Sequence, residues 1–183
     1  VPNGVTMISP SATSPALSTI ADNGYFFRTA PSDARQGQVL AEITMERGIS
    51  NVAVTFTNND YGKGLTDSYV NAYKGLGGKV SAVVPHDEGK ADYSAEVATL
   101  DASGAGVLAV FGYVDQGGRH IIQTSIDSGA FDKFILADGM YGESLLKNVD
   151  GDLSGTFGTV PGTDSKGAES FGRLAKAAGV KVG

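Results

Sequence analysis

Three side chains with complementary chemistry follow three short apolar runs in the sequence: Tyr61, Tyr113 and Asp138. A carboxylate can pair with an ammonium group through charge-assisted hydrogen bonds, which are stronger than neutral ones. Aromatic faces also attract cations, by about 0.5–2 kcal/mol depending on desolvation. Together these side chains would suit a small cationic or zwitterionic molecule, and not a phosphate or a nucleic acid. Each has a structural alternative as well: a tyrosine can pack on its own turn, and Asp138 can cap the Asp138–Gly139 turn.

The elements that must position these side chains are predicted to be parallel strands joined by helices. Strands are expected over 51–57, 79–84, 106–111, 133–137 and 155–160, with helices over 33–47, 61–75, 92–100 and 115–128. This alternation predicts an α/β fold with a doubly wound parallel sheet. Counted from residue 51, the expected strand order is 2-1-3-4-5. That order puts the first, third and fourth strands side by side, and their carboxyl ends then form one ligand crevice.

Local signals set the expected helix boundaries and inward faces. Asp33 is predicted to be the N-cap of the first helix, and Gly48 to end it. In the second helix the inward stripe is predicted to run from Leu65 to Leu76 at helical spacing. A further helix is expected over 164–178, with Phe171, Leu174 and Ala178 on one face.

A turn rich in serine and threonine precedes this lobe. Residues 8–15 offer several hydroxyl and backbone N–H groups, and such a turn can hold a carboxylate with neutral donors. The alternative is a helix start, with Ser14 as N-cap and Pro15 in the first position. Both interpretations remain open from the residues alone.

Composition excludes several classes of function. The formal net charge of the 183 residues is −6, which argues against nucleic acid and against anionic membrane surfaces. No apolar stretch reaches the ~18 residues that span a bilayer, so no membrane insertion is expected. Cysteine is absent, the carboxylates lack metal-loop spacing, and no Gly-x-Ser-x-Gly is present. We therefore expect no catalytic residues, no metal and no cofactor, and we expect the His86–Asp87 pair in a solvated loop.

Several segments, taken in order, resemble the type I periplasmic binding proteins, and most closely the leucine/isoleucine/valine-binding receptors of ABC transporters. The resemblance rests on residues 8–15, on 25–33 with Gln36–Gly37, on 59–64, on 90–94 and on 111–113. It covers residues 1 to about 162. It implies a two-lobed, non-enzymatic receptor that closes around an amino acid.

The resemblance also implies roles for individual residues. Ser11, through its backbone, and Thr13 would hold the ligand's carboxylate, and Tyr61 and Tyr113 would wall the pocket. The ammonium group would fall to Asp138, where relatives carry glutamate. As a separate guess, Met140 and Tyr141 could shape the side-chain end of the pocket.

The resemblance further implies a domain division, a partner and a location. Residues 1–30 would be a stub of lobe one with the first hinge crossing, 31–161 would be lobe two, and 162–183 would be the return crossing with a stub helix. With most of lobe one missing, this chain is expected to bind amino acids weakly or not at all. The intact receptor would be periplasmic and would deliver a branched-chain or apolar amino acid to a membrane permease. The alternatives are a receptor or sensor domain for an amide, urea or an aromatic acid, and a small α/β hydrolase.

Overall fold

A five-stranded parallel sheet forms the centre of the molecule. The computed structural model describes residues 3–162 and 166–180. The strands are β3 (Asn51–Thr57), β4 (Lys79–His86), β5 (Leu108–Phe111), β6 (Phe134–Leu136) and β7 (Phe157–Gly158), in the order β4-β3-β5-β6-β7. Counted from residue 51, this is the order 2-1-3-4-5, so the predicted α/β fold is confirmed. A separate two-stranded parallel sheet is formed by β1 (Met7–Ser9) and β2 (Phe26–Arg28).

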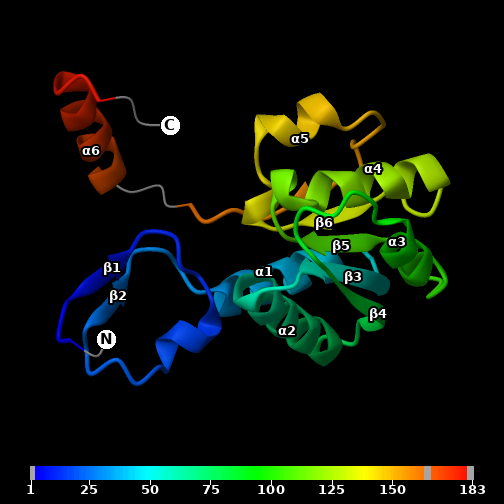
Figure 1. The fold of residues 1–183 in the computed structure, drawn as a ribbon, viewed down its shortest axis with the longest axis horizontal. Helices are drawn as coiled ribbons and strands as arrows, with labels where there is room; N and C mark the ends of the chain where they lie inside the picture. The colour runs from blue at the N-terminus through cyan, green and yellow to red at the C-terminus, as the bar shows by residue number, and fades with distance from the viewer. Residues whose placement is uncertain (1–2, 163–165, 181–183) are drawn as a thin grey trace.

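Helices cover both faces of the central sheet (Figure 1). They are α1 (Asp33–Glu46), α2 (Asp60–Gly75), α3 (Ser94–Asp101), α4 (Gly118–Ser128) and α5 (Glu143–Asn148). Strand β5 shows why two apolar cores result: Leu108 and Val110 belong to the cluster with α3 and α4, whereas Ala109 and Phe111 belong to the cluster with α1 and α2. Successive side chains of a strand point to opposite faces, so a continuous apolar run fits a sheet that is covered on both sides.

Two pieces lie to one side of this α/β body in Figure 1: the β1–β2 sheet and α6 (Lys166–Ala177). Three short 3-10 helices complete the described elements: η1 (Pro15–Ser18), η2 (Val114–Gln116) and η3 (Asp138–Met140). The last two begin within three residues of the ends of β5 and β6, so the chain turns sharply after these two strands.

Glycine ends four of the helices at the edge of the sheet where the strands begin. Gly48, Gly77, Gly104 and Gly129 have φ of 72°, 90°, 70° and 72°, which is the left-handed region that glycine adopts without a steric penalty. A Cβ added at any of them would meet no atom within 4 Å. Gly48, Gly77 and Gly129 lie where the sequence predicts helix ends.

Two predictions about side chains near helix and strand ends are wrong. The N-cap of α1 is Ser32, whose Oγ accepts the N–H of Ala34, while Asp33 is fully buried inside the first turn. His86 is 1% exposed and is no part of a solvated loop, because β4 runs two residues further than predicted. Its ring lies 2.9 Å (Nδ1) from Thr55 Oγ1 and edge-on to Tyr93.

The predicted inward faces of α2 and α6 hold only in part. Leu65 and Tyr69 are buried, but Leu76 is 47% exposed. In α6 Phe171 and Leu174 are 60% and 70% exposed, and only Ala175 of this helix is buried among the described residues.

Candidate ligand-binding site

A pocket of about 370 Å³ opens where the carboxyl ends of β3, β5 and β6 face the β1–β2 segment. It is lined by Ser11, Ala12, Thr13, Ser14, Leu17, Tyr61, Tyr113 and Asp138. All five residues predicted for ligand binding therefore lie in one hollow, although they come from four separate segments. Leu17, in η1, was not predicted from the sequence; its place in the turn after Pro15 gave no signal for it.

Tyr61 links two walls of the pocket. The Asn59 side chain accepts the N–H of Gly62 and so caps α2, which fixes Tyr61 in the first turn. The Tyr61 hydroxyl donates to Asp138 Oδ1 at 3.0 Å, and its ring stacks on Tyr113 with centroids 5.1 Å apart. Burial, with the adjacent Asp138 charge, raises the pKa of Tyr61 well above its usual value. The phenol therefore stays a hydrogen-bond donor at every physiological pH.

Gly139 allows the strand ends to come this close. A Cβ at this position would lie 2.3 Å from the Gly112 carbonyl oxygen, 3.1 Å from Tyr61 Oη and 3.2 Å from Tyr113 Cδ1. No side chain fits there without moving backbone. The tip after β6 thus packs directly on the tip after β5, which holds Asp138 beside the two rings.

The turn at residues 9–14 presents backbone donors to the opposite wall. Ser9 Oγ accepts the N–H of Ala12 at 3.0 Å and the N–H of Ser11 at 3.4 Å. The amides of Thr13 and Ser14 make no hydrogen bond with the described residues, so they are the donors left for a ligand. The two interpretations of this turn are compatible, since Ser14 also stands at the N-cap of η1 with Pro15 in the first position.

A second carboxylate, not predicted from the sequence, belongs to a residue in contact with this turn. Asp33 is 0% exposed, and neither carboxylate oxygen has a hydrogen-bond partner within the described residues. Burial raises its pKa to about 6; the Thr13 side chain and Arg28 lower it, and Asp138 raises it further. The Asp33 N–H donates to the Thr13 carbonyl at 3.0 Å, so α1 and the turn are joined here. The sequence signal was misleading, because Ser32 and Asp33 are both good caps.

Met140 and Tyr141 lie outside this pocket. Met140 is buried against Gly118 of α4, and Tyr141 is 80% exposed. Both line a neighbouring apolar hollow of about 380 Å³ between α5 and β7.

Within residues 3–162 and 166–180, no group of three or more His, Cys, Asp or Glu side chains could hold a metal ion. In the same part of the chain, no helix is long and apolar enough to cross a membrane.

Comparison with known proteins places this architecture in a family. A periplasmic binding protein family profile matches residues 2–181. The chain is 30% identical over 173 residues to a Leu/Ile/Val-binding protein homolog 1 of Brucella abortus, covering 91% of this chain and 46% of that protein. It is 38% identical over 121 residues to a Leu/Ile/Val-binding protein homolog 3 of Brucella melitensis, covering 63% of this chain and 32% of that protein.

Solved structures agree on the fold. A leucine-binding protein LivK from Thermotoga maritima superposes with a TM-score of 0.81 at 22% identity, over 97% of this chain and 51% of that one. The chain spans about half the length of the curated relatives that it matches over most of its own length. These relatives are named as binding proteins and not as enzymes. The family profile extends over nearly all 183 residues, and the chain belongs to the periplasmic binding protein family.

Proposed function

We propose that this chain carries the amino-acid-binding lobe of an extracytoplasmic receptor, which delivers its ligand to the membrane permease of an ABC transporter. The observation that carries the proposal is the pocket itself, where an acid and two stacked phenols face a turn with free amides. A carboxylate at one end of this small hollow and neutral N–H donors at the other end suit a zwitterion. The names of the curated relatives support a branched-chain or apolar amino acid.

Each part of an α-amino acid has a partner in this arrangement. Asp138 would bind the ammonium group, and the Tyr61 hydroxyl would hold the Asp138 carboxylate in place. The Thr13 and Ser14 amides would take the ligand carboxylate, with Ser11 beside them in the pocket lining. The Ser11 N–H, which was predicted for this role, donates to Ser9 Oγ at 3.4 Å instead. The ligand side chain would lie against the two tyrosine rings. The aspartate side chain is one methylene shorter than the glutamate that relatives carry at this position. The ammonium group would therefore lie deeper in the pocket or bind through water.

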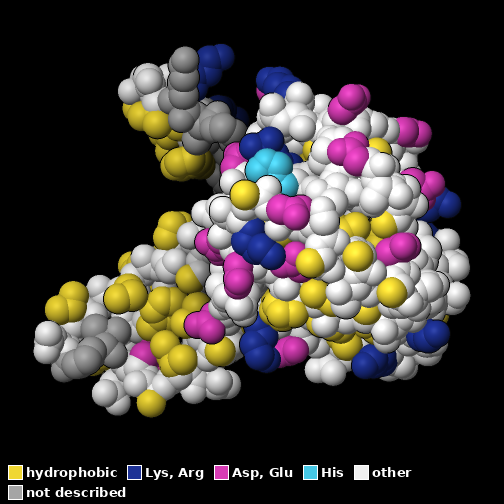
Figure 2. All heavy atoms as spheres, turned by 45° about the vertical axis from the view of Figure 1, so that its right-hand side comes forward, with side chains coloured by type: hydrophobic (Ala, Val, Ile, Leu, Met, Phe, Trp, Pro, Cys, Tyr) yellow, Lys and Arg dark blue, Asp and Glu magenta, His cyan; other side chains and the backbone are white. Residues whose placement is uncertain are grey.

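We further propose the domain division of the resemblance: 1–30 and 162–183 as pieces of lobe one, and 31–161 as lobe two. The support is the exposed apolar surface on the two pieces. Figure 2 shows hydrophobic side chains gathered over both pieces. Ile8 and Phe27 of the first piece and Phe171 and Leu174 of the second are 53–70% exposed. Ligand binding to both lobes would favour the closed receptor by hinge motion.

A thermal-shift screen followed by calorimetry tests the function. The 20 amino acids, urea, simple amides and aromatic acids are screened against the longest natural polypeptide that contains this chain. A ligand that binds the folded state raises its melting temperature by mass action. We expect the largest shift with leucine, isoleucine or valine. A shift confined to amides, urea or aromatic acids would overturn the amino-acid proposal in favour of another solute receptor.

The 183-residue chain serves as the second arm of this experiment. It supplies the pocket but only one closing surface, so we expect it to bind the same amino acid at least tenfold more weakly. Equal affinity for the two polypeptides would reject the division into lobes while leaving the amino-acid proposal intact.

A further inference from the structure

Arg28 ties the pocket turn to strand β2. Its guanidinium group donates to the Ser14 carbonyl at 2.8 Å, to Ser18 Oγ at 2.6 Å and to the Ala12 carbonyl at 3.4 Å. One side chain thus holds three acceptors that span the turn and η1. Arg28 holds the turn without itself lining the pocket.

The orientation of one peptide group follows from this contact. The Ala12 carbonyl and the Thr13 N–H belong to the same peptide, and no described peptide bond is cis. In a trans peptide the C=O and the N–H point in opposite directions. Because Arg28 binds the Ala12 carbonyl, the Thr13 N–H points away from Arg28, and Thr13 is one of the residues that line the pocket. This amide is one of the two without an internal partner.

The charge of Arg28 also matters, because the pocket is otherwise acidic. Asp138 lines it and Asp33 lies buried behind it, while no lysine or arginine is among its lining residues. A ligand carboxylate would meet unfavourable potential from both acids. Arg28 acts in the opposite sense, as its lowering effect on the pKa of Asp33 indicates. A guanidinium bound to a carbonyl also polarises the peptide, which strengthens the N–H on its far side as a donor.

We propose that Arg28 is a positioning residue: it fixes the turn at residues 12–14 and makes the pocket favour an ionised carboxylate over a neutral amide. This inference rests on the proposed amino-acid binding. It adds a determinant of selectivity that has no direct contact with the ligand.

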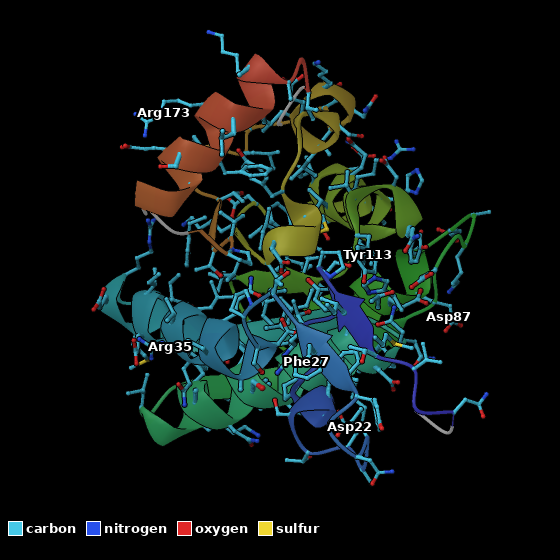
Figure 3. All side chains as sticks on the ribbon, turned by 90° about the vertical axis from the view of Figure 1, so that its left-hand side faces the viewer. Asp22, Phe27, Arg35, Asp87, Tyr113 and Arg173 are labelled. Carbon is cyan, nitrogen blue, oxygen red and sulfur yellow. The ribbon has the colours of Figure 1, made fainter. Side chains whose placement is uncertain are left out.

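The test compares L-leucine with L-leucinamide, which keeps the ammonium group and side chain but lacks the negative charge. Calorimetry is run on the parent and on Arg28→Met and Arg28→Lys variants of the complete polypeptide. The matched control is Arg35→Met, because Arg35 is exposed on α1 and lies well apart from Tyr113 (Figure 3). Melting temperatures establish that each variant is folded.

In Arg28→Met we expect L-leucine to bind about 10- to 100-fold more weakly, the size of effect given by losing charge-assisted hydrogen bonds. L-leucinamide should lose about threefold or less. Arg28→Lys keeps the charge without the planar fork, so its preference for leucine should be intermediate. Arg35→Met should match the parent. In ¹⁵N-labelled protein, the leucine-induced shift of the Thr13 amide should shrink in Arg28→Met.

Three results would overturn the inference. If Arg28→Met loses as much affinity for L-leucinamide as for L-leucine, Arg28 is a general structural support. If a folded Arg28→Met binds both ligands as the parent does, Arg28 has no role in binding. If Arg28→Met does not fold, an Arg28→Lys variant with the parent's ligand preference would count against it in the same way. These failures occur with leucine binding by the parent intact. A parent that binds no amino acid would instead reject the proposed function, and this inference with it.

Discussion

The α/β body and the pieces beside it differ in how far their apolar side chains are exposed to solvent. In the body, Phe134 and Phe111 are fully buried between sheet and helices, whereas Phe27 of β2 and Phe171 of α6 are 53% and 60% exposed. A body with two filled cores can be stable by itself, but pieces with uncovered apolar faces need another surface. The pocket lies at the boundary between them. Asp138 and the two tyrosines of the pocket therefore come from the self-supporting α/β body. The turn proposed to hold the ligand's carboxylate comes from the piece that needs another surface.

The largest expected effect separates the two regions by stability. Phe134→Ala should lower the free energy of unfolding by about 3–5 kcal/mol, because it opens a cavity in a filled core. Phe27→Ala removes the same atoms from a half-exposed position and should cost less than about 1 kcal/mol. Urea unfolding of the two variants of the 183-residue chain measures the contrast. Similar losses would mean that β2 is packed as tightly as the body.

A second contrast lies within the pocket. Asp138→Ala should weaken amino-acid binding by about 2–4 kcal/mol, because an ammonium group would be left without its charged partner. Asp132→Ala removes an exposed carboxylate near the start of β6 and should leave the affinity unchanged. Calorimetry on the complete polypeptide decides. If Asp138→Ala binds like the parent, Asp138 has no ammonium role.

The pH dependence of the body should carry a contribution from His86. Burial lowers the pKa of His86 to about 4, despite the carboxylates of Glu96, Asp87 and Glu88 nearby, while in the unfolded chain it is about 6.5. Between these values the unfolded state binds more protons, so stability falls as the pH falls. The loss should be about 2.5 kcal/mol between pH 7 and pH 4.5. In His86→Gln this part of the pH dependence should vanish, and urea unfolding at both pH values measures it.

Asp33, at the boundary, should act with the opposite sign. Its pKa is about 6 in the folded state and near 3.8 when unfolded, so its contribution is present at low pH and is lost as the pH rises through 6. The loss should be about 2 kcal/mol from pH 4.5 to pH 7. The two contributions nearly cancel in the parent. The contribution of Asp33 is therefore isolated by comparing how the free energy of unfolding changes with pH in the parent and in Asp33→Asn. If the two proteins show the same pH dependence, the burial of an ionisable Asp33 is contradicted.

Much of the fold could be predicted because its signals are local and repeated. The β-branched apolar run at 51–57 and the helix-ending Gly129 each specify an element without knowledge of the rest. The strand order followed from the alternation of strands and helices, and it placed Tyr61, Tyr113 and Asp138 at neighbouring strand ends. Their convergence is a consequence of topology, which the sequence pattern encodes well.

The errors occur where distant residues decide. Ser32 and Asp33 could each cap α1, and only the Thr13 segment, 20 residues away, buries one of them. His86 follows a proline at a strand end, and no residue near it in the sequence predicts that Tyr93 and Gly112 cover its ring. Met140 was expected beside the ligand because it follows Asp138, but the tight turn of η3 directs it into the core under α4. The free amide of Thr13 depends on Arg28, which also lies far along the chain.

The four helix-ending glycines have a practical consequence for engineering. Gly48, Gly77, Gly104 and Gly129 lie in turns at the edge of the sheet opposite the pocket, with open space around each. Exposed turns of this kind tolerate insertions best. A circular permutation or an inserted fluorescent domain near Gly77 or Gly104 would leave the carboxyl-end chemistry untouched. The same architecture that gathers recognition at one edge thus offers the other as an attachment point for a biosensor.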